Sequence, residues 1–170
     1  MNRHLWSLTV GATLSLLLTG CLGYRVGAVG DRNFKSVSVP MFRNQTVTPQ
    51  LEAQVSNAII KRLQQDGTLR VENRETADVV LLGTLTRYRR TAIRATREDS
   101  GVPREYRVTI TARVEVRDQR TGQIILKPTD FEGSAEVFIG ADLQSADYQA
   151  LPLAADDIAR QVVARLVESW

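Results

Sequence analysis

The chain of 170 residues contains one cysteine, Cys21, and one histidine, His4. A single cysteine excludes an intramolecular disulfide, so the fold has to be stabilised by burial of apolar side chains. His4 lies in the amino-terminal segment that is predicted below to be cleaved, so the mature chain would contain no histidine. A Ser-His-Asp or Cys-His nucleophile and the usual zinc sites are then excluded. A phosphate-binding glycine loop is also missing. Paired-carboxylate hydrolysis remains open on composition alone, but no carboxylate pair stands out, and we expect no enzyme, no cofactor and no metal site.

The amino-terminal segment has the pattern of an export signal. An apolar run over residues 5–18 follows a short basic start and ends in Leu18-Thr19-Gly20-Cys21. About 14 apolar residues are too few for the ~20 that a membrane-spanning helix needs. The ending resembles the bacterial lipobox, which implies a signal peptide over residues 1–20 and acyl chains such as palmitate on Cys21. Such chains would hold a domain stably on a bilayer. The alternative is an ordinary secretory signal with a cysteine there by chance.

Removal of the predicted signal leaves 150 residues, which suits one domain, with residues 21–33 as a lipidated tether and residues 34–170 as the folded part. After Arg3 leaves, 21 basic and 19 acidic residues remain, a formal charge of +2, which names no partner. The charge is nevertheless segregated. Residues 87–127 hold 11 basic and 5 acidic side chains, whereas residues 128–159 hold 7 acidic and none basic, so we expect the two segments to meet different partners.

Alternation and turn signals predict the first half of the fold. Residues 35–40 alternate and end at a proline, which predicts a short strand. Thr48 is expected to cap a helix with Pro49 at its first position, and Gly67 to close it, because apolar residues recur at helical spacing between them. Residues 69–73 predict a brief strand and residues 77–88 a longer one.

The second half gives the clearest strand signal. Residues 105–117 alternate strictly between apolar and polar, which predicts a strand with one buried face. A turn at residues 118–122 leads to a return strand over residues 123–138, in which Pro128 marks a break or bulge. Pro152 is expected to start the last helix. The result is an α+β fold of order β-α-β-β-β-β-α, with two amphipathic helices packed on one face of a mostly antiparallel four- to five-stranded sheet.

In this order of elements the chain resembles the lipopolysaccharide-assembly lipoprotein family, LptE. The resemblance covers nearly the whole mature chain but rests on short motifs. They are Gly20-Cys21 with Gly23-Tyr24, Val37-Ser-Val-Pro40, Phe42-Arg-Asn-Gln-Thr46, Pro49-Gln-Leu51, Ala77-Asp78 and Glu105-Tyr106.

The resemblance implies a non-enzymatic protein attached through Cys21 to the periplasmic face of the outer membrane. There it would plug a large β-barrel translocon of the LptD type, assist the barrel's assembly and touch lipopolysaccharide in transit. Nucleic acid is not expected as a partner in that compartment. Leu22 fits the outer membrane, since the usual inner-membrane retention signal is an aspartate at that place.

The arginines around the predicted hairpin connection are the candidate lipopolysaccharide contacts, because arginine suits bidentate binding of phosphate. They are Arg87, Arg89, Arg90, Arg94, Arg97 and Arg104. The alternative is that they only keep a sheet edge from pairing with other strands. Tyr24 and Phe42 are candidate contacts with the barrel wall, although a local cluster under the first strand would explain them equally.

One observation limits the resemblance. Some family members place a basic residue before the last helix, whereas here residues 139–151 have only Asp142 and Asp147 as charges.

A lipoprotein regulator of a peptidoglycan synthase is the alternative function. Such a regulator usually has a long linker, and here about a dozen residues, at most ~40 Å when extended, separate Cys21 from the first strand.

Overall fold

The computed structural model describes residues 34–95, 103–138 and 143–168. Contacts divide the chain into Met1–Asp31 and Arg32–Trp170, and every described residue lies in the second unit. Cys21 and Tyr24 therefore lie outside the described residues. Neither described helix combines the length and hydropathy that a transmembrane span requires.

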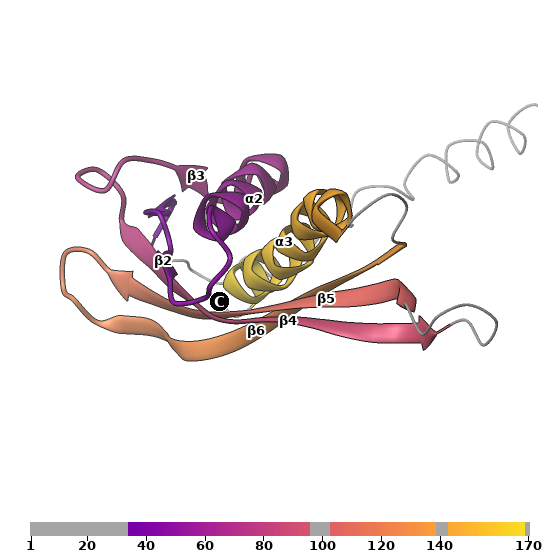
Figure 1. Ribbon diagram of the computed structural model, residues 1–170. Coiled ribbons are helices and arrows are strands. Elements are labelled where there is room, and N and C mark those ends of the chain that lie inside the picture. The colour runs from indigo at the N-terminus through magenta and orange to yellow at the C-terminus, as the bar shows by residue number, and fades with distance from the viewer. Residues whose placement is uncertain (1–33, 96–102, 139–142, 169–170) are drawn as a thin grey trace, which may run out of the picture. The chain divides into compact units, whose positions relative to one another are not determined.

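The described residues form one mixed sheet and two helices (Figure 1). In chain order the elements are β1 (Ser36–Ser38), β2 (Arg43–Asn44), α2 (Leu51–Asp66), β3 (Arg70–Val71), β4 (Val79–Ala95), β5 (Pro103–Asp118), β6 (Ile124–Phe138) and α3 (Leu143–Glu168). The strand order is β3-β1-β4-β5-β6, and β2 pairs with β4. The three long strands pair antiparallel, whereas β1 and β2 pair parallel with β4. The predicted α+β fold is thus confirmed, with β2 as an additional strand too short to show alternation.

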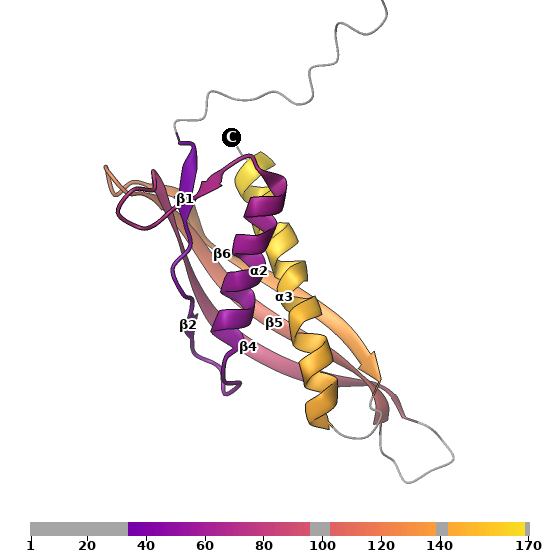
Figure 2. The same cartoon turned by 90° about the horizontal axis from the view of Figure 1, so that it is seen from above.

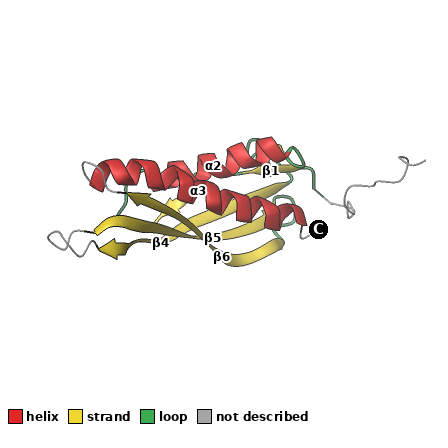
Figure 3. Cartoon of the chain, turned by 90° about the vertical axis from the view of Figure 1, so that its right-hand side faces the viewer, coloured by secondary structure: helices red, strands yellow, loops and turns green. Residues whose placement is uncertain are grey.

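The strict alternation of β5 reflects the burial of one face of the strand, as predicted. Its apolar residues, Val108, Ile110, Ala112, Val114 and Val116, are all fully buried. Both helices cover this one face of the sheet, and they lie side by side along the strands (Figures 2 and 3). The core therefore lies between the sheet and the helix pair, and no helix among the described residues covers the other face of the sheet.

Two glycines allow close approach to this helix-covered face. A Cβ atom on Gly83 would lie 2.1 Å from the Phe42 ring, and one on Gly133 would lie 2.1 Å from the carbonyl oxygen of Ala154 in α3. Any side chain at Gly133 would therefore push α3 away from β6. These positions require glycine because of space, not because of backbone conformation.

The predicted start of the first helix is wrong at the cap. Gln50, with φ of 62°, occupies the N-cap position without a side-chain cap, and α2 begins at Leu51. Asn44 explains the shift, because its Nδ2 atom donates to the Thr48 carbonyl at 2.8 Å and to Glu52 Oε2 at 2.7 Å. Thr48 is thereby held in a turn that precedes the helix. The predicted end is confirmed, since Gly67 adopts φ of 71° and donates to the carbonyl of Leu63.

The predicted start of the last helix is also wrong, because α3 begins at Leu143 and contains Pro152 in its interior. Proline cannot donate to the carbonyl four residues earlier. However, Pro152 is exposed, while Ala146 and Ala150 are buried and continue the apolar stripe towards the amino terminus. Tertiary packing of that stripe outweighs the lost hydrogen bond.

The β5–β6 connection follows the prediction. Asp118 Oδ1 accepts hydrogen bonds from the backbone N–H groups of Arg120 and Thr121, and Gly122 adopts φ of 70°. The pairing then shifts at the predicted bulge: Val114 lies opposite Thr129, whereas Val116 lies opposite Leu126. Between these two pairs β6 has one more residue than β5. Pro128 lies in this bulge, where no backbone N–H is needed for hydrogen bonding between the strands.

Candidate functional site

The sheet face opposite the helices, here called the open face, carries rows of polar side chains. Register places Thr84, Arg113 and Asp130 in one row across β4, β5 and β6. Nearer the β4–β5 connection, Arg87 pairs with Thr111 and Arg89 with Thr109. Because the apolar residues of β5 point to the helices, these alternate positions all point away from them.

The candidate arginines do not all share that face. Arg87 and Arg89 lie on the open face. Arg90 lies opposite Val108, so it belongs to the helix-covered side. Arg94 and Arg104 belong to β4 and β5, and Arg97 lies outside the described residues. A β-bulge between Leu85 and Arg87 causes the change of face, and sequence alternation gave no sign of it.

Arg90 forms a cluster with Tyr88 and Asp147. Arg90 Nη2 lies 2.9 Å from Asp147 Oδ2, and its Nε donates to the Tyr88 hydroxyl at 3.1 Å. The Tyr88 hydroxyl donates in turn to Asp147 Oδ1 at 3.0 Å. Burial raises the pKa of Tyr88, and the hydrogen bond to Tyr88 raises the pKa of Arg90. The cluster attaches the first turns of α3, which precede Pro152, to strand β4.

The two charge-segregated segments lie side by side and pair with each other. Arg113 forms a bidentate ion pair with Asp130, at 2.7 and 3.0 Å, and Arg107 pairs with Glu136. The Arg113 hydrogen bond lowers the pKa of Asp130, and Arg87 lowers it further through its charge. The acidic strand β6 is thus the neighbour of the basic strand β5. Part of the segregated charge is therefore paired within the chain, between the two segments.

Arg87 and Arg89 differ from these paired arginines, since neither makes an ion pair within the described ranges. They also lie where β4 becomes an edge strand. β2 pairs only as far as Leu85, whose carbonyl accepts from the Gln45 N–H, and no described strand continues along that edge. Their position therefore suits both anion contact and protection of an unpaired edge.

The structure places Phe42 in the core, with 3% of its surface exposed. Its ring lies on Gly83, and its backbone N–H donates to Ser56 Oγ at 3.0 Å. The folded chain therefore does not present this ring to a barrel wall. The local cluster under the first strands, which the sequence offered as the alternative, accounts for Phe42.

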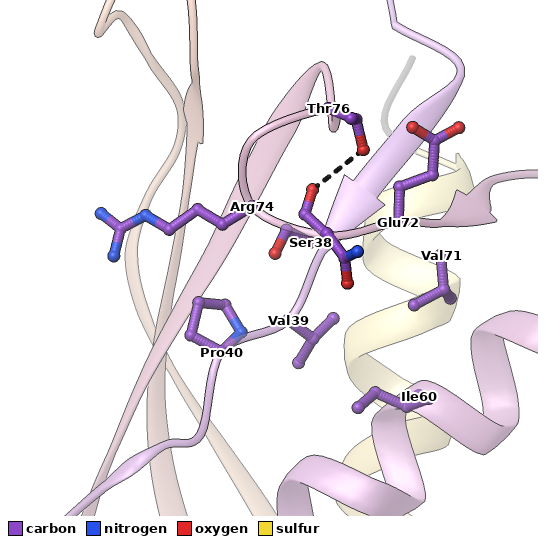
Figure 4. Close-up of a pocket in the computed structure, with 9 residues that line it drawn as sticks. Ser38, Val39, Pro40, Ile60, Val71, Glu72, Arg74 and Thr76 are labelled. Carbon is purple, nitrogen blue, oxygen red and sulfur yellow. Dashed lines mark hydrogen bonds between the residues drawn. The ribbon is translucent and has the colours of Figure 1, made fainter.

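A hollow of about 650 Å³ lies between β1, β3 and α2, at the end of the sheet away from the β4–β5 connection (Figure 4). Val39, Ile60 and Val71 form its apolar side, and Thr76 Oγ1 donates to the Asn73 carbonyl beside them. Glu72 and Arg74 are its charged residues. Within residues 34–95, 103–138 and 143–168, no group of histidine, cysteine, aspartate and glutamate is arranged to hold a metal ion.

A second hollow, of about 460 Å³, lies on the open face, where Arg43, Arg74 and Arg113 line it. These three residues are far apart in the chain, so no sequence pattern groups them. In the sequence, Arg43 lies in a predicted loop, Arg74 directly after the predicted strand at residues 69–73, and Arg113 inside the predicted strand at residues 105–117. Tertiary structure alone brings them together.

Comparison with solved structures supports the fold. A protein of Xanthomonas campestris has a TM-score of 0.57 and 11% identity over 79% of this chain and 85% of that chain. An uncharacterized lipoprotein B of Nitrosomonas europaea has a TM-score of 0.55 and 10% identity over 87% and 92%. A hypothetical protein of Chlamydia trachomatis has a TM-score of 0.54 and 15% identity over 78% and 95%. At these identities the likeness establishes the fold alone.

Comparison with curated protein sequences finds no match. Among protein families, LptE, described as lipopolysaccharide-assembly, matches residues 34–166. The match includes all the described strands and α2, and it reaches nearly to the end of α3. Because it spans most of the chain, the protein belongs to the lipopolysaccharide-assembly family LptE.

Proposed function

We propose that the protein is an outer-membrane lipoprotein, anchored by acyl chains on Cys21, that plugs and helps assemble the β-barrel lipopolysaccharide translocon. In this role it is not an enzyme, and it helps deliver lipopolysaccharide to the cell surface. The observation that carries the proposal is the family match over residues 34–166. Residues 1–20 act as the signal peptide and residues 21–33 as the tether.

The polar open face supports a place inside a barrel. Interiors of porin-like barrels are polar, and the open face offers arginine, threonine and carboxylate side chains along three long strands. The pairs Arg107–Glu136 and Arg113–Asp130 offset four of the charges that this face would bring against a polar wall. An LptD-like barrel is therefore the partner that we propose.

The arginines near the β4–β5 connection are the proposed lipopolysaccharide contacts. Arg87 and Arg89 have guanidinium groups without an ion pair in the described part of the chain. Arg94 and Arg104 belong to the same hairpin, and Arg97 lies between them in the sequence. Guanidinium groups bind phosphates bidentately and could replace divalent cations there. Arg90 can contact lipopolysaccharide only if a phosphate displaces Asp147 from the Arg90 guanidinium group.

Affinity purification from outer membranes tests the partnership. The lipidated protein at native expression should recover a stoichiometric, very large β-barrel, identified by mass. A Cys21→Ser variant should lose lipidation and remain outside the membrane fraction. Recovery of a periplasm-spanning peptidoglycan synthase in place of a barrel would contradict the proposal and favour the regulator.

Measurement of bound lipopolysaccharide tests the arginine contacts. An Arg87→Gln/Arg89→Gln variant should retain at least tenfold less lipopolysaccharide than the wild type, because two unpaired phosphate donors are lost. Arg62→Gln, on the exposed side of α2, removes a positive charge elsewhere and serves as the matched control. Equal retention by the double variant and the wild type would leave edge protection as the role of these arginines.

A further inference from the structure

We propose that the hollow on the open face near β2, here called the β2–β5 hollow, binds the phosphate group of an amphiphile. It has a volume of about 460 Å³, which is within the usual range for small-molecule sites. This site is separate from the hairpin arginines and does not depend on the function proposed for them.

Three arginines from three parts of the fold line the β2–β5 hollow. Register places Arg43 of β2 beside Thr84 of β4, and Thr84 beside Arg113 of β5. Arg74 comes from the loop between β3 and β4. Figure 4 shows its side chain extending away from Ile60 and Val71, and Arg74 lines both hollows.

The loop that carries Arg74 is fixed at several points. The Gln119 side-chain amide donates to the Arg74 carbonyl, and the Gln119 backbone N–H donates to the Asp78 carbonyl at 2.9 Å. Within the loop, the Ala77 N–H donates to the Asn73 carbonyl at 3.0 Å. Arg74 is therefore held near the hollow by a loop whose position is set before any ligand binds, which lowers the entropic cost of binding.

The charges around the hollow do not balance among the described residues. Arg43 and Arg74 make no ion pair with any of them, although neighbouring arginines do. Glu115 is the acidic residue in the lining, and both its oxygens accept from Arg117, at 2.8 and 3.2 Å. Arg113 is held by Asp130, yet 56% of its side chain is exposed. An anion in the hollow would meet two unpaired guanidinium groups and a third that is accessible.

Apart from Thr84, the rest of the lining is apolar. Pro40, Met41, Leu82 and Pro128 take part in it, and 60% of Met41 is exposed. Arginine favours phosphate over other anions through its planar pair of donors, while an apolar floor stabilises hydrocarbon and not a free ion. The combination points to a phosphate carried on an apolar chain, as in a lipid headgroup.

Calorimetric titration tests the site directly. The lipidated protein, held in phosphatidylcholine nanodiscs, is titrated with dihexanoylphosphatidic acid, with dihexanoylphosphatidylcholine and with inorganic phosphate. We expect the phosphatidic acid to bind at least tenfold more tightly than either of the other two. Arg43→Gln/Arg74→Gln should weaken its binding at least tenfold, whereas Lys61→Gln/Arg62→Gln, which removes two exposed cations of α2, should change it less than twofold.

A second variant tests the apolar floor. Met41→Gln keeps the size of an exposed side chain and should weaken binding of the phosphatidic acid about threefold, with no effect on inorganic phosphate. The proposal is overturned if the wild type does not bind the phosphatidic acid. It is equally overturned if both double variants lose binding alike, or if inorganic phosphate binds as tightly as the lipid. Unchanged melting temperatures of the variants establish that each effect is local.

Discussion

The two faces of the sheet are made by the same three long strands, but their side chains are held in different ways. On the helix-covered face, Leu81, Leu85 and Ile110 are fully buried, and glycine allows α3 to approach β6 closely. On the open face, arginines and carboxylates pair across strands while remaining about half exposed. Buried apolar area contributes most to stability, whereas exposed ion pairs contribute little. The open face can therefore vary in sequence at low cost and carry binding functions.

The largest expected effect contrasts two neighbouring residues of the β1–β2 segment. Phe42→Ala should lower the free energy of unfolding by about 4 kcal/mol, because it empties the space above Gly83. Met41→Ala, at a residue 60% exposed, should change it by less than about 0.5 kcal/mol. Urea unfolding measures both. If the two variants were equally stable, Phe42 would not belong to the core, and the barrel-wall contact would return as its role.

The next effect tests the contact between β6 and α3. Gly133→Ala should destabilise the fold by about 2 kcal/mol, since the new methyl group must displace the backbone of α3 at Ala154. Ser134→Ala, the next residue along β6 and exposed, should be nearly neutral. Melting temperatures give the comparison. A neutral Gly133→Ala would mean that α3 moves freely over the sheet.

A smaller effect is expected for the cluster that links β4 to α3. Tyr88→Phe removes the hydroxyl that donates to Asp147 and accepts from Arg90, and should lower stability by about 1 kcal/mol. Hydrogen exchange should rise in α3 before Pro152. Tyr148→Phe, at a residue 71% exposed, is the control. Equal exchange in both variants would argue against a role for the cluster in holding this end of α3.

The smallest effect depends on pH. Asp78 accepts hydrogen bonds from the backbone N–H groups of Lys35 and Ser36 and from Ser36 Oγ, and these lower its pKa, with the Lys35 bond as the main cause. A lowered folded-state pKa gives stability that is complete above the unfolded pKa of about 3.9 and is lost as pH falls through the folded value. Asp78→Asn should therefore be less stable than the wild type at pH 7, by about 1 kcal/mol.

Thermal unfolding across the acid range checks this sign. The stability difference between the wild type and Asp78→Asn should shrink as pH falls below 4, because the wild-type carboxyl becomes protonated too. Glu75→Gln, at an exposed residue of the same loop, should track the wild type at every pH. A difference that stays constant from pH 7 to pH 2 would show that the charge of Asp78 has no part in its effect.

Local patterns were sufficient where a single physical rule acts. The alternation of β5, the helix end at Gly67 and the bulge at Pro128 were all predicted, because each depends on periodicity or on one residue's backbone. Predictions failed where a distant residue intervened. Asn44 moved the start of α2, and packing of Ala146 and Ala150 carried α3 through Pro152.

The candidate site shows the same division. The run of arginines in β4 was visible in the sequence, but the bulge before Arg87 decided that Arg87 and Arg89 face away from the helices and that Arg90 faces them. The grouping of Arg43, Arg74 and Arg113 was not visible, because it depends on the parallel pairing of β2 with β4 and on the loop held by Gln119.

The sequence by itself determined the α+β class, the strand and helix faces and the family, since these follow from periodicity, turn residues and motif order. Only the tertiary structure decided which charges pair and which remain available. Ion pairs and binding hollows depend on distances of a few ångströms between strands, and those distances are set by register, bulges and packing, which no local pattern encodes.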